Sequence, residues 1–243
     1  GNVPLGRVVE IVERSLPFPS ARRSRPVPLG RAPRRLSAAI NRADWSQVHL
    51  VAGNRTVPAN HPDRAPLVLL SWILGGGVSS RLFQSMRERA GLAYNVYAHA
   101  SFWRDTGAFT VACSVDPRNL ARATDILREE LSRLTREGIT HDEMAGARAQ
   151  ITASIFIAAE SAETRLFRLF NGLAYHGRYR SPAESAREIE RTGRNRVMEV
   201  AERYLSWDDC TVVTVGPGRL AARLDRHVPV AGRVDVPAAR PLG

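Results

Sequence analysis

The stretch that decides the fold is LGGGVSSRLFQSMRERAGLAYNV, residues Leu74–Val96. Three consecutive glycines are followed by two serines and by a segment that contains both apolar residues and arginines. Another glycine and a segment that contains a tyrosine come next. Within it, residues 79–89 place Leu82, Phe83 and Met86 on one side at helical spacing. We therefore expect a turn at the glycines, a short amphipathic helix, and then a strand.

The sequence on either side of this stretch predicts a sheet with a helix packed on it. Residues 92–102 and 107–115 are rich in aromatic and β-branched residues, and the turn sequence WRDTG separates them. This pattern predicts a β-hairpin. Upstream, residues 46–53 alternate apolar with polar positions, as a half-buried strand does. Residues 65–74 are apolar enough for a buried helix.

The second half of the chain carries helix start signals. Asp116 before Pro117 predicts an N-cap, for a helix that stops near Gly138. Two capping boxes, THDE and SPAE, predict helix starts at Thr140 and Ser181. Further helices are expected from Ser161 and over 194–205, and a strand over 210–215. The helix from Ser161 is expected to bury Leu166, Leu169, Phe170 and Leu173.

This order of elements predicts an α+β fold with a mostly antiparallel sheet and helices packed on one face. A helix is expected over 4–16, and a Pro- and Arg-rich extended linker over 17–35. The globular domain is expected over 36–217, and residues 218–243 are expected to form a mobile C-terminal tail.

Composition limits the classes of partner. The net charge is +11, but all 35 basic residues are arginine, which indicates a bias toward GC-rich codons, as in a bacterial source, more than selection for nucleic acid. Six arginines crowd into the Pro-rich stretch, which fits either a solvated linker or a patch for an acidic partner. No apolar run approaches the length of a membrane helix. We expect a cytoplasmic protein that binds neither membrane nor nucleic acid.

The chain shows no self-sufficient catalytic centre. Gly75, Gly76 and Gly77 are not followed by the lysine of a phosphate loop, and they do not have the spacing of a dinucleotide-binding fingerprint. The roles left open for them are a tight turn, a hinge or a substrate-facing loop. No two histidines lie within four residues of each other, so we expect no metal site. The two cysteines, Cys113 and Cys210, lie in strand-like apolar contexts and are expected to be buried thiols.

The run GGGVSSRLFQSMRERAGLAYNVYA resembles the pitrilysin/insulinase-type (M16) zinc peptidases, which include the mitochondrial processing peptidases. In that family a Gly-rich turn leads into S-R-L-F-x-x-x-R, then G-L-x-Y and a strand. The resemblance extends over residues 1–217 and implies the LuxS- and mitochondrial processing peptidase-like metallohydrolase fold. Residues 1–16 would then be the last helix of a preceding homologous domain, and 36–217 the second domain.

The resemblance also implies a division of labour. The family's first half carries the zinc motif H-x-x-E-H, which is absent here. Its second half holds no metal and contributes an arginine and a tyrosine seven residues apart, which fall on Arg87 and Tyr94. The chain is expected to bind peptide and to complete a zinc endopeptidase whose metal lies upstream or on another subunit, with no activity alone. An inert assembly subunit of the same family and a basic nucleic-acid-binding protein are the alternatives.

Overall fold

The computed structural model of the chain describes residues 3–16, 37–42, 44–217 and 232–235. It divides into two compact units, Gly1–Ala32 and Pro33–Gly243. The first unit contains helix α1 (Leu5–Ser15), in which every side chain is exposed. The helix expected over 4–16 is thus confirmed, whereas the whole linker expected over 17–35 lies outside the described residues.

The second unit is built on a mixed sheet. Its strands are β1 (Ser37–Asn41), β2 (Val48–Thr56), β3 (Ala93–Phe102), β4 (Gly107–Val115), β5 (Thr211–Gly216) and β6 (Gly232–Asp235). Their spatial order is β3-β4-β2-β5-β1-β6. Pairing is antiparallel from β3 across to β5 and parallel from β5 to β6, so β3 is an edge strand of the described sheet. The expected hairpin is confirmed, but neither β1 nor β6 was predicted, and β6 lies in the segment expected to be a tail.

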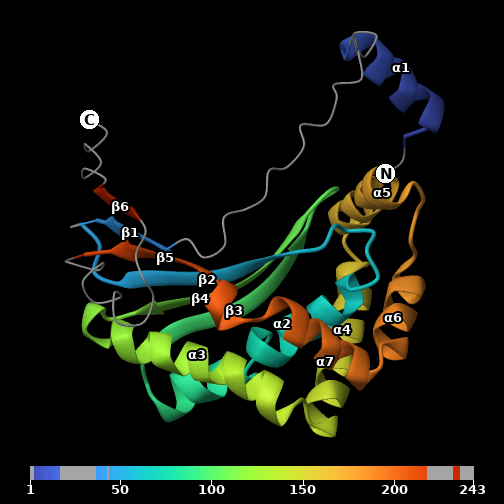
Figure 1. Cartoon of the computed structure of the whole chain (residues 1–243). Coiled ribbons are helices and arrows are strands. Elements are labelled where there is room, and N and C mark those ends of the chain that lie inside the picture. Colours follow the sequence, from blue (N-terminus) through green and yellow to red (C-terminus); the bar gives the residue numbers. More distant parts are fainter. Residues whose placement is uncertain (1–2, 17–36, 43, 218–231, 236–243) are drawn as a thin grey trace. The chain divides into compact units, whose positions relative to one another are not determined.

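Helices gather on one face of this sheet (Figure 1). They are α2 (Arg64–Gly75), the π-helix η1 (Phe83–Arg89), α3 (Leu120–Glu137), α4 (His141–Ala158), α5 (Ala162–His176), α6 (Pro182–Arg191) and α7 (Arg194–Tyr204), with short 3-10 turns η2 (Pro117–Asn119) and η3 (Trp207–Asp209). The predicted α+β class is therefore confirmed. Among the described residues, no helix is both long enough and apolar enough to span a bilayer.

The predicted helix starts are largely confirmed. At α4 the capping box is complete, because the Glu143 amide donates to the Thr140 hydroxyl (3.2 Å) and the Thr140 amide donates to the Glu143 carboxylate (2.8 Å). At α6 only half of the box forms. The Ser181 hydroxyl accepts from the Glu184 amide (3.1 Å), while the Glu184 carboxylate pairs with Arg178 instead.

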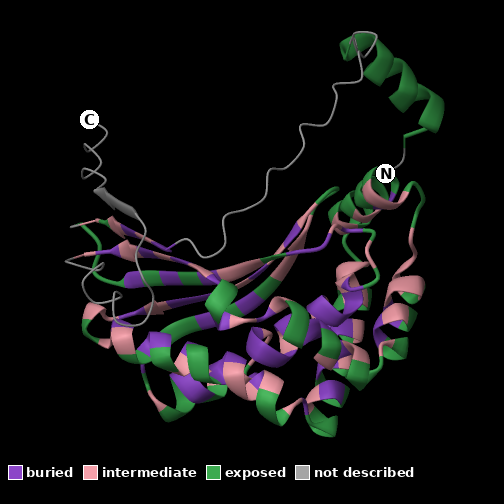
Figure 2. Ribbon diagram, viewed as in Figure 1, coloured by how far each residue is buried: buried purple, intermediate pink, exposed green. Residues whose placement is uncertain are grey.

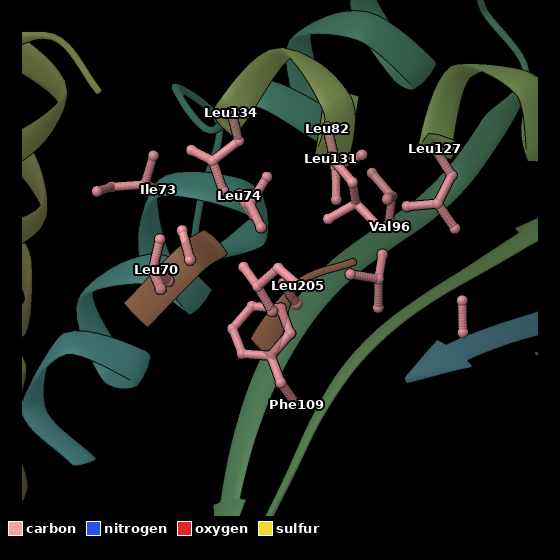
Figure 3. Packing of buried hydrophobic residues seen from close by; sticks show 14 of the residues in the cluster. Leu70, Ile73, Leu74, Leu82, Val96, Phe109, Leu127, Leu131, Leu134 and Leu205 are labelled. Atoms are coloured by element: carbon pink, nitrogen blue, oxygen red, sulfur yellow. The ribbon is translucent and has the colours of Figure 1, made fainter. Parts of the chain in front are cut away.

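The core lies between the sheet and the helices (Figure 2). Leucines of α2 and α3 converge there with Phe109 of β4 and Val96 of β3 (Figure 3). Phe109 is only 2% exposed, and burying such a side chain contributes roughly 2–3 kcal/mol. Asp63, which precedes α2, is also fully buried, and it accepts from the Tyr204 hydroxyl of α7 (3.1 Å). The helical layer is thereby tied together by both apolar and polar contacts.

The first glycine of the opening stretch lies at the closest contact between helix and sheet. Gly75 is the buried last residue of α2. A Cβ added there would lie 2.2 Å from the Ala98 amide nitrogen and 2.7 Å from the Tyr97 carbonyl carbon, both in the backbone of β3. Only glycine fits this position, so the glycine run marks a close approach of α2 to the edge strand.

The predicted orientation of α5 is wrong. Its regularly spaced apolar residues are between 43% and 64% exposed instead of buried; they are Leu166, Leu169, Phe170 and Leu173. Helical spacing shows that one side of a helix is apolar, but it does not show whether the same chain covers that side. No described element of this unit covers it.

Two glycine substitutions test the packing of α2 on β3. Gly75→Ala drives a methyl group into the β3 backbone and is expected to lower the free energy of unfolding by about 3 kcal/mol or more. Gly77→Ala is the control, because its Cβ would meet only the Gln150 side chain at 3.5 Å, an ordinary contact. We expect a change below about 1 kcal/mol there. Thermal or chemical denaturation measures both, and equal stabilities would contradict the packing described here.

Candidate functional site

The candidate site begins where η1 turns into β3. Gly91 follows η1 with a φ of +60°, a conformation that glycine adopts without strain. The Leu92 amide then donates to the Met86 carbonyl (2.9 Å), and this hydrogen bond ends the π-helix η1. The chain reverses over three residues, so the last turn of η1 lies beside the first residues of β3.

Tyr94 lies at an irregularity in β3. Ala93 is opposite Val115 and Asn95 is opposite Ser114, so Tyr94 has no partner residue in the β3–β4 register. Such a bulge bends a strand and redirects a side chain, and bulges are common at sheet edges and beside active sites. The Tyr94 side chain is 79% exposed.

The structure brings the two predicted site residues together. The Arg87 guanidinium carbon lies 5.6 Å from the centroid of the Tyr94 ring and 4.8 Å from that of Phe83. Both distances are within the range of a cation–π contact. Stacking on two rings positions the guanidinium while its N–H donors stay available. Arg87 forms no hydrogen bond or ion pair with any residue that the structure describes.

The other two arginines of the stretch have structural partners. Arg81 donates two hydrogen bonds to the Glu143 carboxylate (2.6 and 2.8 Å) and one to the Gly138 carbonyl (2.6 Å). Burial opposes ionisation of Glu143, but the hydrogen bonds from Arg81 and Thr140 outweigh it and hold the pKa of Glu143 below its ordinary value. Arg89 lies 3.7 Å from Glu130. Of the three side chains, Arg87 is the one whose donors are not used within the described residues.

The glycine run lies next to this site. The Gly76 amide donates to the Trp72 carbonyl (3.0 Å) and ends α2, and the Gly77 carbonyl accepts from the Ser80 amide (3.0 Å). Packing against β3 accounts for Gly75. A role of Gly75, Gly76 and Gly77 as a hinge or substrate loop stays a prediction.

The described residues hold no group of three His, Cys, Asp or Glu side chains that could bind a metal ion. Both cysteines are buried thiols, as expected. Burial raises the pKa of the Cys113 thiol to about 12, so it stays protonated at neutral pH.

The chemistry that the site offers is therefore that of donors: a guanidinium and a phenol at one end of an edge strand. Such donors can hold a carbonyl oxygen or an oxyanion.

The sequence did not predict a cavity of about 340 Å³ at the far end of β3. Arg64, Phe102 and Arg168 line it, and they come from α2, β3 and α5. These residues are widely separated in the sequence and belong to no motif, so no local pattern could have indicated them.

Comparison with known proteins places the chain in a family. The sequence profile of the peptidase M16 inactive domain matches residues 1–151. An uncharacterized zinc protease of Mycobacterium tuberculosis (strain H37Rv) is 32% identical over 214 residues, which cover 85% of this chain and 48% of that protein. A second, from Bacillus subtilis, is 30% identical over 174 residues, covering 72% and 42% respectively. The chain thus spans about half the length of the curated relatives it matches.

Solved structures show the same fold. A protease from Helicobacter pylori superposes with a TM-score of 0.72 at 18% identity, covering 89% of this chain and 53% of that one. A peptidase M16 inactive domain from Pseudomonas fluorescens superposes with a TM-score of 0.63 at 22% identity, covering 76% and 44%. With the sequence matches, these likenesses support one conclusion: the chain belongs to the M16 peptidase family, in which it corresponds to the inactive domain.

Proposed function

We propose that the chain is the substrate-binding, non-metal half of a zinc-dependent endopeptidase. In this proposal Arg87 and Tyr94 complete an active site whose zinc is held by another segment or subunit. The observation that carries it is the guanidinium of Arg87, which has no hydrogen-bond or ion-pair partner among the described residues and lies over the exposed ring of Tyr94 at the start of an edge strand. The zinc-protease names of relatives about twice as long support it.

The two side chains suit peptide hydrolysis. Attack on a peptide bond places negative charge on the carbonyl oxygen, and donors fixed in advance toward that oxygen stabilise the transition state. Zinc, where it is bound, polarises the carbonyl and activates water. Arg87 offers several N–H donors and Tyr94 one O–H donor, so the pair can hold the scissile carbonyl or its neighbour. Because the two halves must meet, the site would form only on closure.

The edge strand offers a place for the peptide. The outer edge of β3 has no neighbouring strand among the described residues. An extended peptide can add to such an edge through backbone hydrogen bonds, which recognise its conformation more than its sequence. Tyr97 and His99 are exposed along the same strand and would contact the side chains of the added peptide.

The apolar side of α5 is the proposed docking surface for the zinc-bearing half. Together with the end of α4 it forms an exposed apolar patch, most of which lies on α5, largely green in Figure 2. The patch consists of Phe156, Ile157, Leu166, Phe167, Leu169, Phe170 and Leu173. Exposed apolar clusters of this kind commonly mark interfaces. The occupant proposed is the other half because the relatives contain about as much chain again beyond the part that matches.

Substitutions at the donor pair test the proposed catalytic role. With a zinc-bearing half that carries H-x-x-E-H, Arg87→Gln and Tyr94→Phe are each expected to lower kcat/KM for an unstructured peptide by about 100-fold, because each removes a transition-state donor. Association of the halves, measured by calorimetry, should not change. Arg118→Gln and Tyr179→Phe are matched controls, since Arg118 is an exposed arginine on another element and Tyr179 is an exposed tyrosine between α5 and α6. Full activity of the Arg87 and Tyr94 variants would instead favour an assembly role.

A charge placed in the apolar patch tests the docking surface. Leu166→Glu is expected to raise the Kd for the zinc-bearing half by at least about tenfold, because a carboxylate would be buried at the interface. Val78→Glu is the control, since the exposures of Val78 (68%) and Leu166 (64%) are similar but Val78, which lies between α2 and η1, is not part of the patch. If both variants bind with the affinity of the unaltered chain, the interface lies elsewhere.

A further inference from the structure

The cavity at the far end of β3 carries an excess of positive charge. Three arginines line it, Arg64, Arg168 and Arg180, together with His176. None of the described residues that line this cavity is acidic. A cavity walled by guanidinium groups attracts anions, and guanidinium forks match the geometry of a carboxylate or a phosphate.

The nearby carboxylates do not neutralise this charge. Arg180 pairs with Glu188, and Arg64 lies 4.0 Å from the same carboxylate, so one acid is shared by two guanidinium groups. Arg168 donates to the Ser185 hydroxyl (3.2 Å) and has no acidic partner among the described residues. The charge that remains is thus concentrated around Arg168.

Arg168 also has a buried donor without an acceptor among the described residues. This donor is its Nε, and seven other buried side-chain atoms of the described residues are in the same state. The arginines that line the cavity, and not this atom alone, therefore indicate an anionic ligand. The neighbouring groups support this. The pKa of Arg64 is lowered, mainly by burial and also by the charges of Arg180 and Arg168, although Glu188 opposes the shift. The pKa of His176 is lowered by burial and by the charges of Arg180 and Arg64. A bound anion would relieve this repulsion.

The cavity also has an apolar side. Phe102, Phe167 and Tyr175 contribute aromatic rings to its lining, and the Arg64 guanidinium lies 5.4 Å from the centroid of the Phe102 ring. A small, strongly hydrated ion would gain nothing from these rings. An anionic group carried on an organic chain would use both the arginines and the rings.

The edge strand connects this cavity to the candidate site. Phe102 is the last residue of β3, and Tyr94 lies near its start. The eight steps between them span roughly 26 Å at about 3.3 Å per residue. Figure 1 shows the far end of β3 reaching toward α5, which supplies Phe167 and Arg168 to the cavity. An extended peptide paired with this edge, and held at Tyr94, would bring a residue about eight positions away to the arginines.

We propose that this cavity binds a carboxylate of the substrate peptide, either a glutamate or aspartate side chain or the terminal carboxylate, at a distance of about eight residues from the bond held by Arg87 and Tyr94. The inference rests on the proposed function, since it takes the peptide to lie along β3. It assigns to the chain a preference for anionic peptides at a position remote from the cleaved bond.

Fluorescence anisotropy of labelled peptides on the chain alone tests the inference without catalysis. The probes carry one glutamate about eight residues before or after the central bond, or glutamine there, with a free or amidated C-terminus. We expect the better-placed carboxylate to bind at least about tenfold more tightly than its neutral counterpart. Comparing the glutamate and glutamine peptides with the peptides that have a free or an amidated C-terminus identifies which carboxylate the cavity binds.

Variants of the cavity provide the decisive comparison. Arg168→Gln should abolish the preference for the charged peptide, and Arg168→Lys should retain part of it, with folding of both checked by thermal denaturation. Arg118→Gln makes the same change of charge far from the cavity lining and should leave the preference intact. Equal affinities for charged and neutral peptides overturn the inference, as does a preference that persists in folded Arg168→Gln.

Two further results separate this inference from the proposed function. Inorganic phosphate should weaken binding of the charged peptide and leave binding of the neutral peptide unaffected. Tight binding of phosphate by a chain that shows no preference between the peptides would overturn the peptide assignment. The cleavage defects of Arg87→Gln and Tyr94→Phe do not depend on peptide charge. If those defects occur without a charge preference, the cavity assignment alone fails. If the preference occurs without those defects, the catalytic role fails.

Discussion

The contact between the end of α2 and the backbone of β3 determines the geometry of the site. Gly75 leaves no space for a side chain against Ala98, so α2 rests directly on the edge strand. The chain must then leave α2 at Gly76, form η1, and reverse at Gly91 to enter the strand on which α2 already rests. This path places the last turn of η1 beside the start of β3. Arg87 and Tyr94 face each other as a consequence of that packing.

The result resembles one side of an active site. Arg81 and Arg89 are engaged with Glu143 and Glu130, as structural arginines are. Arg87 instead lies over the rings of Phe83 and Tyr94, and none of its donors is used by another residue that the structure describes. Donors that are held in place by packing can bind a ligand without first being ordered. The described residues provide these donors but no group of three side chains that could bind a metal ion.

Much of the fold could be predicted from the sequence, because it depends on local signals. The caps at Thr140 and Ser181 and the hairpin around residues 103–106 are set by neighbouring residues. The pair Arg87 and Tyr94 could be identified only through the family resemblance, since no spacing rule reveals that a helix and a strand will meet there. The structure brings the two side chains into contact, and the role that the resemblance assigns to them stays a prediction.

Other features depend on contacts that local patterns do not encode. β1 and β6 are short strands whose pairing joins distant parts of the chain. The apolar side of α5 was predicted to be buried, but periodicity does not identify the surface that covers it. The bulge at Tyr94 is a matter of register between two strands, and the arginine-lined cavity draws its residues from α2, α5 and the loop before α6. Such features depend on tertiary structure.

The central claim is that this chain completes an active site whose metal lies on another segment. The most direct measurement is a titration of a separately produced zinc-bearing M16 half with this chain, with the initial rate of peptide cleavage as the readout. We expect negligible cleavage by either half alone and a rate that rises to saturation at one chain per zinc-bearing half. A zinc-bearing half that cleaves equally fast with and without the bound chain would contradict it.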